Sequence, residues 1–217
     1  MSAKIHEGQP VFQFGTEAQD AQLAVILLHG RGGSAEGMVP LAQALHVKGA
    51  NFLIPQAALN RWYPNSAFGP LETNEPDLSS ALEMIDLLVA QIEQQGFSHQ
   101  QIAFGGFSQG ACLASEYVAR NARRYAGLFV LSGALIGPRG MARSYAGSLE
   151  GTPVFIGGSD VDPWVAHDLI SESARVLEQM SASVDFRTYP GMAHTVNQDE
   201  IDSVRSLLAS ALIPKKS

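Results

Sequence analysis

The sequence predicts an α/β fold with a mostly parallel sheet, and three observations lead to this prediction. Short apolar segments rich in β-branched residues alternate with segments of helical periodicity along the chain. Several of the apolar segments contain almost no polar residue, which is typical of parallel strands covered on both faces. Hydrophobic residues make up 46% and charged residues 16% of the 217 residues, the composition of a globular protein. We therefore expect one domain over residues 1–217.

Seven segments have the length and composition of strands. They are residues 10–14, 23–29, 51–55, 101–107, 125–132, 152–158 and 183–189. A helix is expected over 77–95, where apolar side chains fall on one face before Gly96. The last helix, 198–212, follows Asn197, and Glu200 stands three residues later, close to a capping box. The longest irregular stretch is expected to be 56–76, and long loops often carry function.

Charge and composition restrict the partners. The net charge of −7 and a sequence pI of about 5.3 argue against binding nucleic acid or anionic membranes through bulk charge. The first ten residues lack the apolar core of a secretion signal, and no apolar run approaches the roughly 20 residues of a membrane span. Cys112 is the only cysteine, so no disulfide can form within the chain. We expect a soluble, cytoplasmic protein with no integral membrane association.

The turn after the fourth expected strand carries the pattern G-x-S-x-G, from Gly106 to Gly110. A residue on a sharp strand-to-helix turn adopts strained backbone angles, and its neighbours must be small. Ser108 would then project from the carboxyl end of the sheet, where open α/β sheets place their sites. The amide of Gln109 opens the helix and can stabilise an oxyanion. The pattern is loose in a chain with 21 glycines, but the strand before it and the helix after it favour Ser108 as a nucleophile.

A serine is a poor nucleophile at neutral pH, so a base and an orienting acid are expected after it in the chain. His194 lies between the last strand and the last helix and is the predicted base. His29 ends a strand inside a glycine-rich turn, and we expect it to shape that turn by hydrogen bonding. The remaining histidines are expected to be exposed and without a role in the site; they are His6, His46, His99 and His167.

The acid should follow a strand between the serine and the histidine. Asp160 and Asp162 both follow the strand 152–158, and either is near enough to its end to reach His194. A pair of this kind can also belong to a surface turn or a metal site. No cluster with metal-ligand spacing accompanies it, so no metal is expected.

A second oxyanion donor is expected in the glycine-rich turn 27–38, which follows the strand 23–29. Arg31 is placed to give its backbone amide. A phosphate-binding loop is the competing interpretation, but the turn has neither G-x-x-x-x-G-K-[ST] nor a clean G-x-G-x-x-G. Oxyanion turn, Ser, Asp and His thus follow one another along the chain, an order that a chance match would rarely produce.

Four motifs, HGRGG (29–33), GFSQG (106–110), SDVDPWV (159–165) and YPGMAHT (189–195), resemble those of the α/β-hydrolase phospholipase/carboxylesterase family. This family includes acyl-protein thioesterases. The likeness spans roughly 23–212, and the segment PQAALNRWYP is similar to the small bacterial branch. The resemblance implies an α/β-hydrolase fold with helices flanking the sheet and no large lid domain.

The resemblance also implies a catalytic triad and a reaction. Ser108 and His194 match the family's nucleophile and base, and Asp162 matches the acid of a D-x-x-V-P motif, with Ala166 in the usual Pro position. Asp160 is the alternative acid. The expected reaction is hydrolysis of an ester or thioester through an acyl-enzyme, with the oxyanion held by the amides of Arg31 and Gln109.

The expected ligand is a small-molecule ester or thioester. Trp62, Tyr63 and Phe68 are candidates for the wall of an acyl pocket, with Met38 and Trp164 nearby; alternatively, these aromatics simply pack the loop onto the sheet. Cys112 is expected to be a buried small residue rather than a second nucleophile. No cofactor and no nucleic-acid partner are expected, and since family members are often dimers, a homodimer is the assembly that the resemblance suggests.

Two other functions fit parts of the sequence. A dienelactone-hydrolase-like lactone hydrolase would share the fold, but that group usually carries Cys at the position of Ser108. A non-catalytic binding protein on this fold would be expected to lose a triad residue, and none is missing from the motifs.

Overall fold

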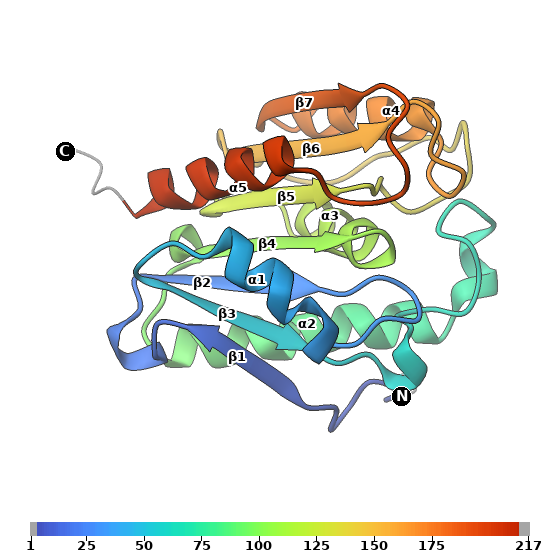
Figure 1. Ribbon diagram of the computed structural model, residues 1–217. Coiled ribbons are helices and arrows are strands. Elements are labelled where there is room, and N and C mark those ends of the chain that lie inside the picture. The colour runs from blue at the N-terminus through green and yellow to red at the C-terminus, as the bar shows by residue number, and fades with distance from the viewer. Residues whose placement is uncertain (1–3, 213–217) are drawn as a thin grey trace.

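The computed structural model describes residues 4–212, which form one seven-stranded sheet with helices on both faces (Figure 1). The strands are β1 (Val11–Gly15), β2 (Leu23–Leu28), β3 (Ala50–Pro55), β4 (Ile102–Phe107), β5 (Gly127–Leu131), β6 (Pro153–Ser159) and β7 (Ser183–Tyr189). They lie in the order β1-β3-β2-β4-β5-β6-β7, and all neighbours are parallel except β1 and β3. The predicted mostly parallel sheet is confirmed.

Five α-helices are present in the described residues: α1 (Val39–Leu45), α2 (Asp77–Gln94), α3 (Gln109–Arg120), α4 (His167–Gln179) and α5 (Gln198–Ala211). Helices α1 and α5 cover one face of the sheet, and α2, α3 and α4 cover the other (Figure 1). Each face therefore has its own hydrophobic core. Strands β2, β3 and β5 are buried at every residue because both of their faces are covered.

The segment 132–152, between β5 and β6, has no helix or strand, whereas the stretch 56–76 contains two short 3-10 helices. The expectation that 56–76 would be the longest irregular stretch was therefore wrong. Arg143 stabilises the segment 132–152, because its guanidinium donates hydrogen bonds to the carbonyls of Leu135 and Ile136 at 3.1 and 2.6 Å. Buried Ser173 and Glu116, farther away in the chain, accept hydrogen bonds from the amides of the same two residues at 2.9 and 3.1 Å. Side chains thus replace regular backbone pairing here, and no periodicity in the sequence reveals them.

Helix α5 begins with the predicted capping box, and one of its members is a buried acid. The amide of Asn197 donates to Glu200 Oε2 at 2.9 Å, and the amide of Glu200 donates to Asn197 Oδ1 at 3.0 Å. Glu200 is fully buried, its Oε1 has no hydrogen-bond partner among the described residues, and the carboxyl lies against Gly157 of β6. Burial raises the pKa of the Glu200 carboxyl to about 7.

This raised pKa predicts a dependence of stability on pH. Between about pH 4.5 and pH 7 the folded protein keeps a proton on Glu200 that the unfolded chain has lost, so this group's contribution to stability falls as pH rises. We expect Glu200→Gln to match the wild type near pH 4.5 and to exceed its unfolding free energy at pH 8 by up to about 3 kcal/mol. Urea unfolding at both pH values measures the difference. Glu178→Gln, an exposed acid on α4, is the control, and a wild-type-to-variant difference that does not change with pH would contradict the prediction.

Candidate active site

Ser108 occupies the turn between β4 and α3 in a strained conformation, with φ 55° and ψ −120°. Its amide donates to the carbonyl of Leu131 at 2.9 Å. A Cβ on Gly106 would lie 2.6 Å from the carbonyl oxygen of Leu28, and a Cβ on Gly110 would overlap with the same oxygen. Both glycines are thus required for the close approach of α3 to β2, and they allow the sharp turn that the sequence pattern predicts.

A chain of two hydrogen bonds joins Ser108, His194 and Asp162. His194 Nε2 lies 2.9 Å from Ser108 Oγ, and His194 Nδ1 lies 2.6 Å from Asp162 Oδ2. The other carboxylate oxygen of Asp162 accepts hydrogen bonds from the amides of Trp164 and Val165 at 2.8 and 3.1 Å. The Asp162 side chain is fully buried, whereas that of His194 is 16% exposed. The carboxylate is therefore fixed in place, and the imidazole remains accessible to a ligand.

Asp160 contacts a different part of the same loop. It is exposed, and its Oδ1 accepts a hydrogen bond from the amide of Gly191 at 2.8 Å. The loops after β6 and β7 lie together because these two strands are neighbours in the sheet. Asp160 therefore ties the loop that carries His194 to the loop after β6, and the structure brings Asp162, not Asp160, to the imidazole.

The glycine-rich turn after β2 lies beside Ser108 because β2 and β4 are neighbouring parallel strands. A Cβ on Gly30 would be 3.4 Å from the Cβ of Ser108. The amides of Arg31 and Gln109 donate no hydrogen bond to any group in residues 4–212. For Gln109 the reason is its position at the first turn of α3, where no intrahelical acceptor exists. Both amides are thus available to a bound oxyanion.

His29 shapes this turn, as predicted. It is fully buried, and its Nε2 accepts a hydrogen bond from the amide of Ala57 at 3.0 Å. The proton must then be on Nδ1, which donates to the carbonyl of Gly30 at 2.8 Å. Burial lowers the pKa of His29, which favours this neutral form.

His6 was expected to be exposed, and that prediction was wrong. It is 1% exposed, its Nδ1 accepts from the amide of Ala58 at 3.1 Å, and its Nε2 donates to the carbonyl of Trp62 at 3.0 Å. The reason is that the N-terminal segment packs over a loop more than 50 residues later in the chain. The other three histidines expected to be exposed are half-buried; they are His46, His99 and His167.

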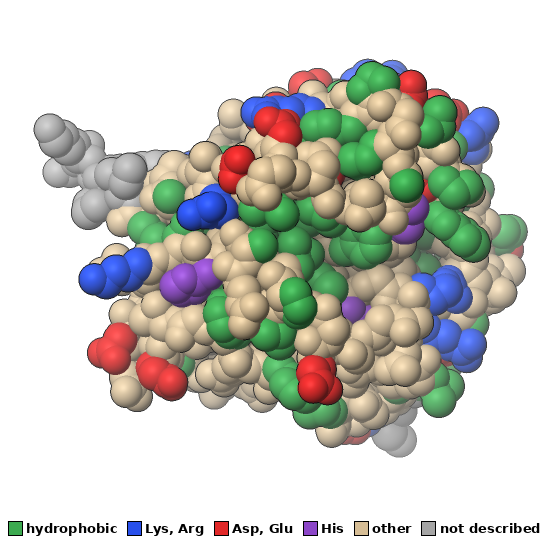
Figure 2. All heavy atoms as spheres, viewed as in Figure 1, with side chains coloured by type: hydrophobic (Ala, Val, Ile, Leu, Met, Phe, Trp, Pro, Cys, Tyr) green, Lys and Arg blue, Asp and Glu red, His purple; other side chains and the backbone are tan. Residues whose placement is uncertain are grey.

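A pocket of about 500 Å³ lies beside Ser108 and His194. Tyr63 and Phe68 line it, and so does Trp164, whose side chain is 73% exposed. Hydrophobic, histidine and cationic side chains gather on the surface at the edge where the strands reach their carboxyl ends (right side of Figure 2). The pocket therefore has the aromatic walls that the sequence suggested.

Trp62 does not line this pocket, contrary to the expectation for it. The side chain is fully buried behind the wall, and its Nε1 donates to the carbonyl of His29 at 2.8 Å. The rings of His29 and His6 pack against the indole, with centroids 4.9 and 5.7 Å away. Met38 belongs to the core on the opposite face of the sheet. The alternative interpretation of the aromatics as packing residues thus applies to Trp62.

The side chain of Gln109 has a function that the sequence did not reveal. Its Oε1 accepts from the amide of Trp62 at 2.9 Å, and its Nε2 donates to the carbonyl of Tyr63 at 2.9 Å. Buried Asn74 similarly accepts from the amide of Asn65 and donates to the carbonyl of Ser66, both at 2.8 Å. These amides fix the pocket wall, and their partners are too far away in sequence, or too irregular in spacing, to form a motif.

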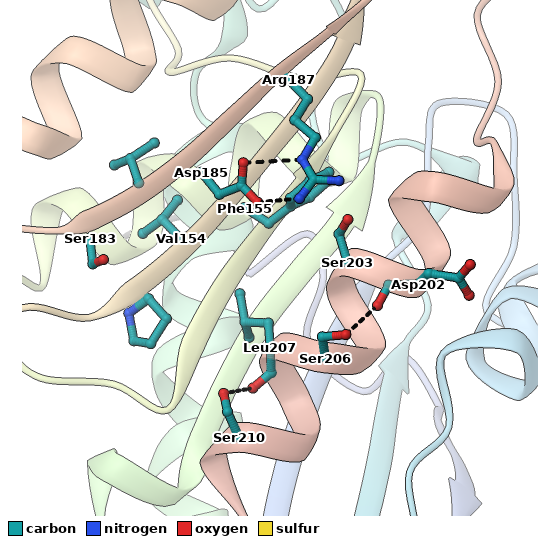
Figure 3. Close-up of a pocket in the computed structure, with 12 residues that line it drawn as sticks. Val154, Phe155, Ser183, Asp185, Arg187, Asp202, Ser203, Ser206, Leu207 and Ser210 are labelled. Atoms are coloured by element: carbon teal, nitrogen blue, oxygen red, sulfur yellow. Dashed lines mark hydrogen bonds and ion pairs between the residues drawn. The ribbon is translucent and has the colours of Figure 1, made fainter.

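A second pocket, of about 450 Å³, lies between α5 and the strands β6 and β7 (Figure 3). Arg187 lies over the ring of Phe155 and forms ion pairs of 2.8 Å with Asp185 and Asp199. Each charged side chain that lines this groove has an ion-pair partner within 4.0 Å, and none of the predicted site residues lines it. It has no part in the site around Ser108.

Residues 4–212 contain neither a cluster of metal-ligating side chains nor a membrane-spanning helix. No three side chains of His, Cys, Asp or Glu come together as a metal site would require. None of the helices has both the length and the apolar character needed to cross a bilayer. The carboxylates of Asp160 and Asp162 contact different partners, the amide of Gly191 and the ring of His194.

The sequence profile of the family described as Phospholipase/Carboxylesterase matches residues 12–212. The chain belongs to this family. The crystal structure of a phospholipase/carboxylesterase from Dyadobacter fermentans has a sequence 41% identical to it and a TM-score of 0.90, covering 96% of this chain and 100% of that one. The chain is therefore a serine ester hydrolase with the α/β-hydrolase fold, as the motifs predicted.

Two similar proteins from yeasts are named acyl-protein thioesterase 1. Acyl-protein thioesterase 1 of Kluyveromyces lactis is 29% identical over 217 residues, which cover 91% of this chain and 95% of the relative. Acyl-protein thioesterase 1 of Saccharomyces cerevisiae is 29% identical over 216 residues, covering 89% and 95%. The match spans nearly the whole length of both proteins. The comparisons do not assign the chain to a bacterial branch of the family.

The state of Cys112 yields a prediction that needs no substrate. The thiol is buried, as the sequence suggested, and burial raises its pKa to about 12, so it is protonated. Cys112 borders the pocket beside Ser108 but is only 2% exposed. We expect the folded protein to react negligibly with Ellman's reagent at pH 8 and the urea-unfolded chain to release one equivalent of thionitrobenzoate. Rapid reaction of the folded protein, with retention of its circular dichroism, would contradict the buried position.

Proposed function

We propose that the chain hydrolyses carboxylic esters and thioesters through a triad of Ser108, His194 and Asp162 and a covalent acyl-enzyme. The observation that carries the proposal is the chain of hydrogen bonds from Ser108 Oγ through the imidazole to Asp162. The names of the yeast relatives, acyl-protein thioesterase 1, support including thioesters among the substrates.

In the first step, Ser108 Oγ attacks the carbonyl carbon while His194 Nε2 accepts its proton. The negative charge that develops on the carbonyl oxygen is stabilised by the amides of Arg31 and Gln109 and by the amino end of α3. Asp162 accepts a hydrogen bond from the N–H group at Nδ1 and stabilises the imidazolium by its negative charge. Because its other oxygen is held by two backbone amides, the carboxylate need not reorganise as charge develops.

In the second step, the tetrahedral intermediate expels the alcohol or thiol, which takes the proton from His194 Nε2. The same nitrogen then removes a proton from water, whose oxygen attacks the acyl-enzyme. Collapse of the second intermediate returns the proton to Ser108 Oγ and releases the carboxylic acid. The 16% exposure of the imidazole gives the water access to it.

The pocket accounts for the binding of the acyl group. Tyr63, Phe68 and Trp164 present aromatic surface beside the nucleophile, which suits an apolar chain of moderate length. The wall is held by hydrogen bonds between its backbone and the side chains of His6, Gln109 and Asn74 rather than by an α-helix or strand. We propose that this wall keeps its shape when substrate binds, and thus that it limits the length of the acyl chain.

Replacement of the nucleophile tests the proposal directly. We expect wild type to hydrolyse p-nitrophenyl esters from acetyl to palmitoyl with a distinct chain-length optimum, and Ser108→Ala to lower kcat by about 10⁴-fold or more. The matched control is Ser115→Ala on the same helix, whose hydroxyl only donates to the carbonyl of Cys112 and whose loss should leave activity near wild type. Equal hydrolysis by wild type and Ser108→Ala would refute the serine mechanism.

Substitutions of Asp162 and Asp160 test which of the two aspartates is the acid of the triad. We expect Asp162→Asn to lower kcat by about 10⁴-fold, because an amide cannot hold the imidazole in the required tautomer or stabilise its charge. Asp160→Asn should cost less than about tenfold, since the amide oxygen can still accept from Gly191. Steady-state kinetics on one p-nitrophenyl ester decides between them, and the opposite ranking would transfer the role to Asp160.

A further inference from the structure

The active-site pocket contains a single formally charged side chain of the Lys, Arg, Asp and Glu type, that of Arg31. No Asp or Glu lines the pocket, and Arg31 forms no ion pair within 4.0 Å of a carboxylate in the described part of the chain. The chain as a whole has a net charge of −7. Among the residues that line it, the pocket of this acidic protein thus has one cation and no carboxylate, and the nearby carboxylate of Asp162 is buried behind His194.

The guanidinium of Arg31 is held in place. Its two Nη atoms donate to the carbonyls of Pro64 and Asn65, which belong to the pocket wall. The wall is fixed in turn, because Asn74 binds the amide of Asn65 at 2.8 Å. The two carbonyl groups orient the guanidinium, but because they carry no net charge they do not neutralise it. Since a guanidinium has five N–H groups, further donors remain for a ligand.

The charge also lies near the reacting atoms. Arg31 follows Gly30, whose Cα directly faces Ser108, and its own amide is a proposed oxyanion donor. Burial raises the pKa of the Tyr63 phenol in the same pocket, and among the smaller effects the charge of Arg31 lowers it. Arg31 is an exposed residue, so its guanidinium lies at the solvent-facing side of the pocket, where salt partly screens its charge.

We propose that Arg31 forms an anion subsite, and that the enzyme prefers esters or thioesters carrying a carboxylate or phosphate a few atoms from the scissile carbonyl. This inference rests on the ester hydrolysis proposed above and specifies its substrate class. The anion can belong to the acyl group or to the leaving group, and both would meet the same guanidinium. A side chain that merely clamped the wall would instead affect neutral and anionic substrates equally.

Two matched substrate pairs separate these cases. On the acyl side, p-nitrophenyl butyrate is compared with mono-p-nitrophenyl succinate, which replaces the terminal methyl group with a carboxylate. On the leaving-group side, S-butyryl-N-acetylcysteine is compared with its methyl ester. The measured quantity is the ratio of kcat/KM for the anionic substrate to that for the neutral one, after subtraction of spontaneous hydrolysis.

The variants are Arg31→Gln, which removes the charge, and Arg31→Lys, which keeps the charge but loses the two-carbonyl clamp. We expect Arg31→Gln to lower the anionic-to-neutral ratio about tenfold in at least one pair, and Arg31→Lys to keep it within about threefold of wild type. The pair that responds identifies the side of the substrate that carries the anion. Lys48→Gln, an exposed charge before the amino end of β3, is the control and should leave both ratios unchanged.

An equal loss on neutral and anionic substrates in Arg31→Gln would overturn the anion subsite and leave the clamp alone. If Arg31→Gln does not fold, the wild-type ratio at low and high salt serves instead, since screening should lower it when a fixed charge is responsible. A ratio that is insensitive to salt would overturn the proposal. Hydrolysis of no substrate above the level of Ser108→Ala would instead refute the function on which the inference rests.

Discussion

The close approach of α3 to the end of β2 is the constraint on which the rest of the site depends. Gly106 and Gly110 permit it, because a side chain at either position would collide with the carbonyl of Leu28. The approach accompanies the strained conformation of Ser108 at the start of α3, where the first amide has no intrahelical acceptor. It also sets the turn after β2 against Ser108, so one backbone contact positions the nucleophile and both proposed oxyanion donors.

The pocket wall is maintained by buried hydrogen bonds rather than by regular structure. His6, His29 and Gln109 each bind backbone groups of the loop 56–63, and each comes from a different part of the chain. Such a bond contributes roughly 1 kcal/mol net, but leaving a buried partner unpaired costs about 1–3 kcal/mol, so the arrangement resists partial opening. A long loop thereby becomes a fixed surface beside the nucleophile.

The two aspartates after β6 show how one loop supplies two functions. Asp162 is buried and meets the imidazole, while Asp160 is exposed and meets the backbone two residues after β7. The residues stand two apart, so a carboxylate directed at His194 and a carboxylate directed at Gly191 come from the same short turn. Arg31 combines functions in a similar way, since its amide lies beside Ser108 while its side chain joins the wall.

The sequence by itself determined the features that depend on local spacing. Short sequence patterns predict four such features: the alternation of strands and helices, the glycines around Ser108, the capping box of α5 and the place of His194 after the last strand. The tertiary structure decided what depends on contacts between distant segments. Three features belong to this group: the choice of the aspartate that contacts His194, the burial of His6 and the position of Trp62 behind the pocket wall. The physical reason is that burial and hydrogen-bond partners arise from chain segments 30 to 60 residues apart, and no local periodicity records such pairings.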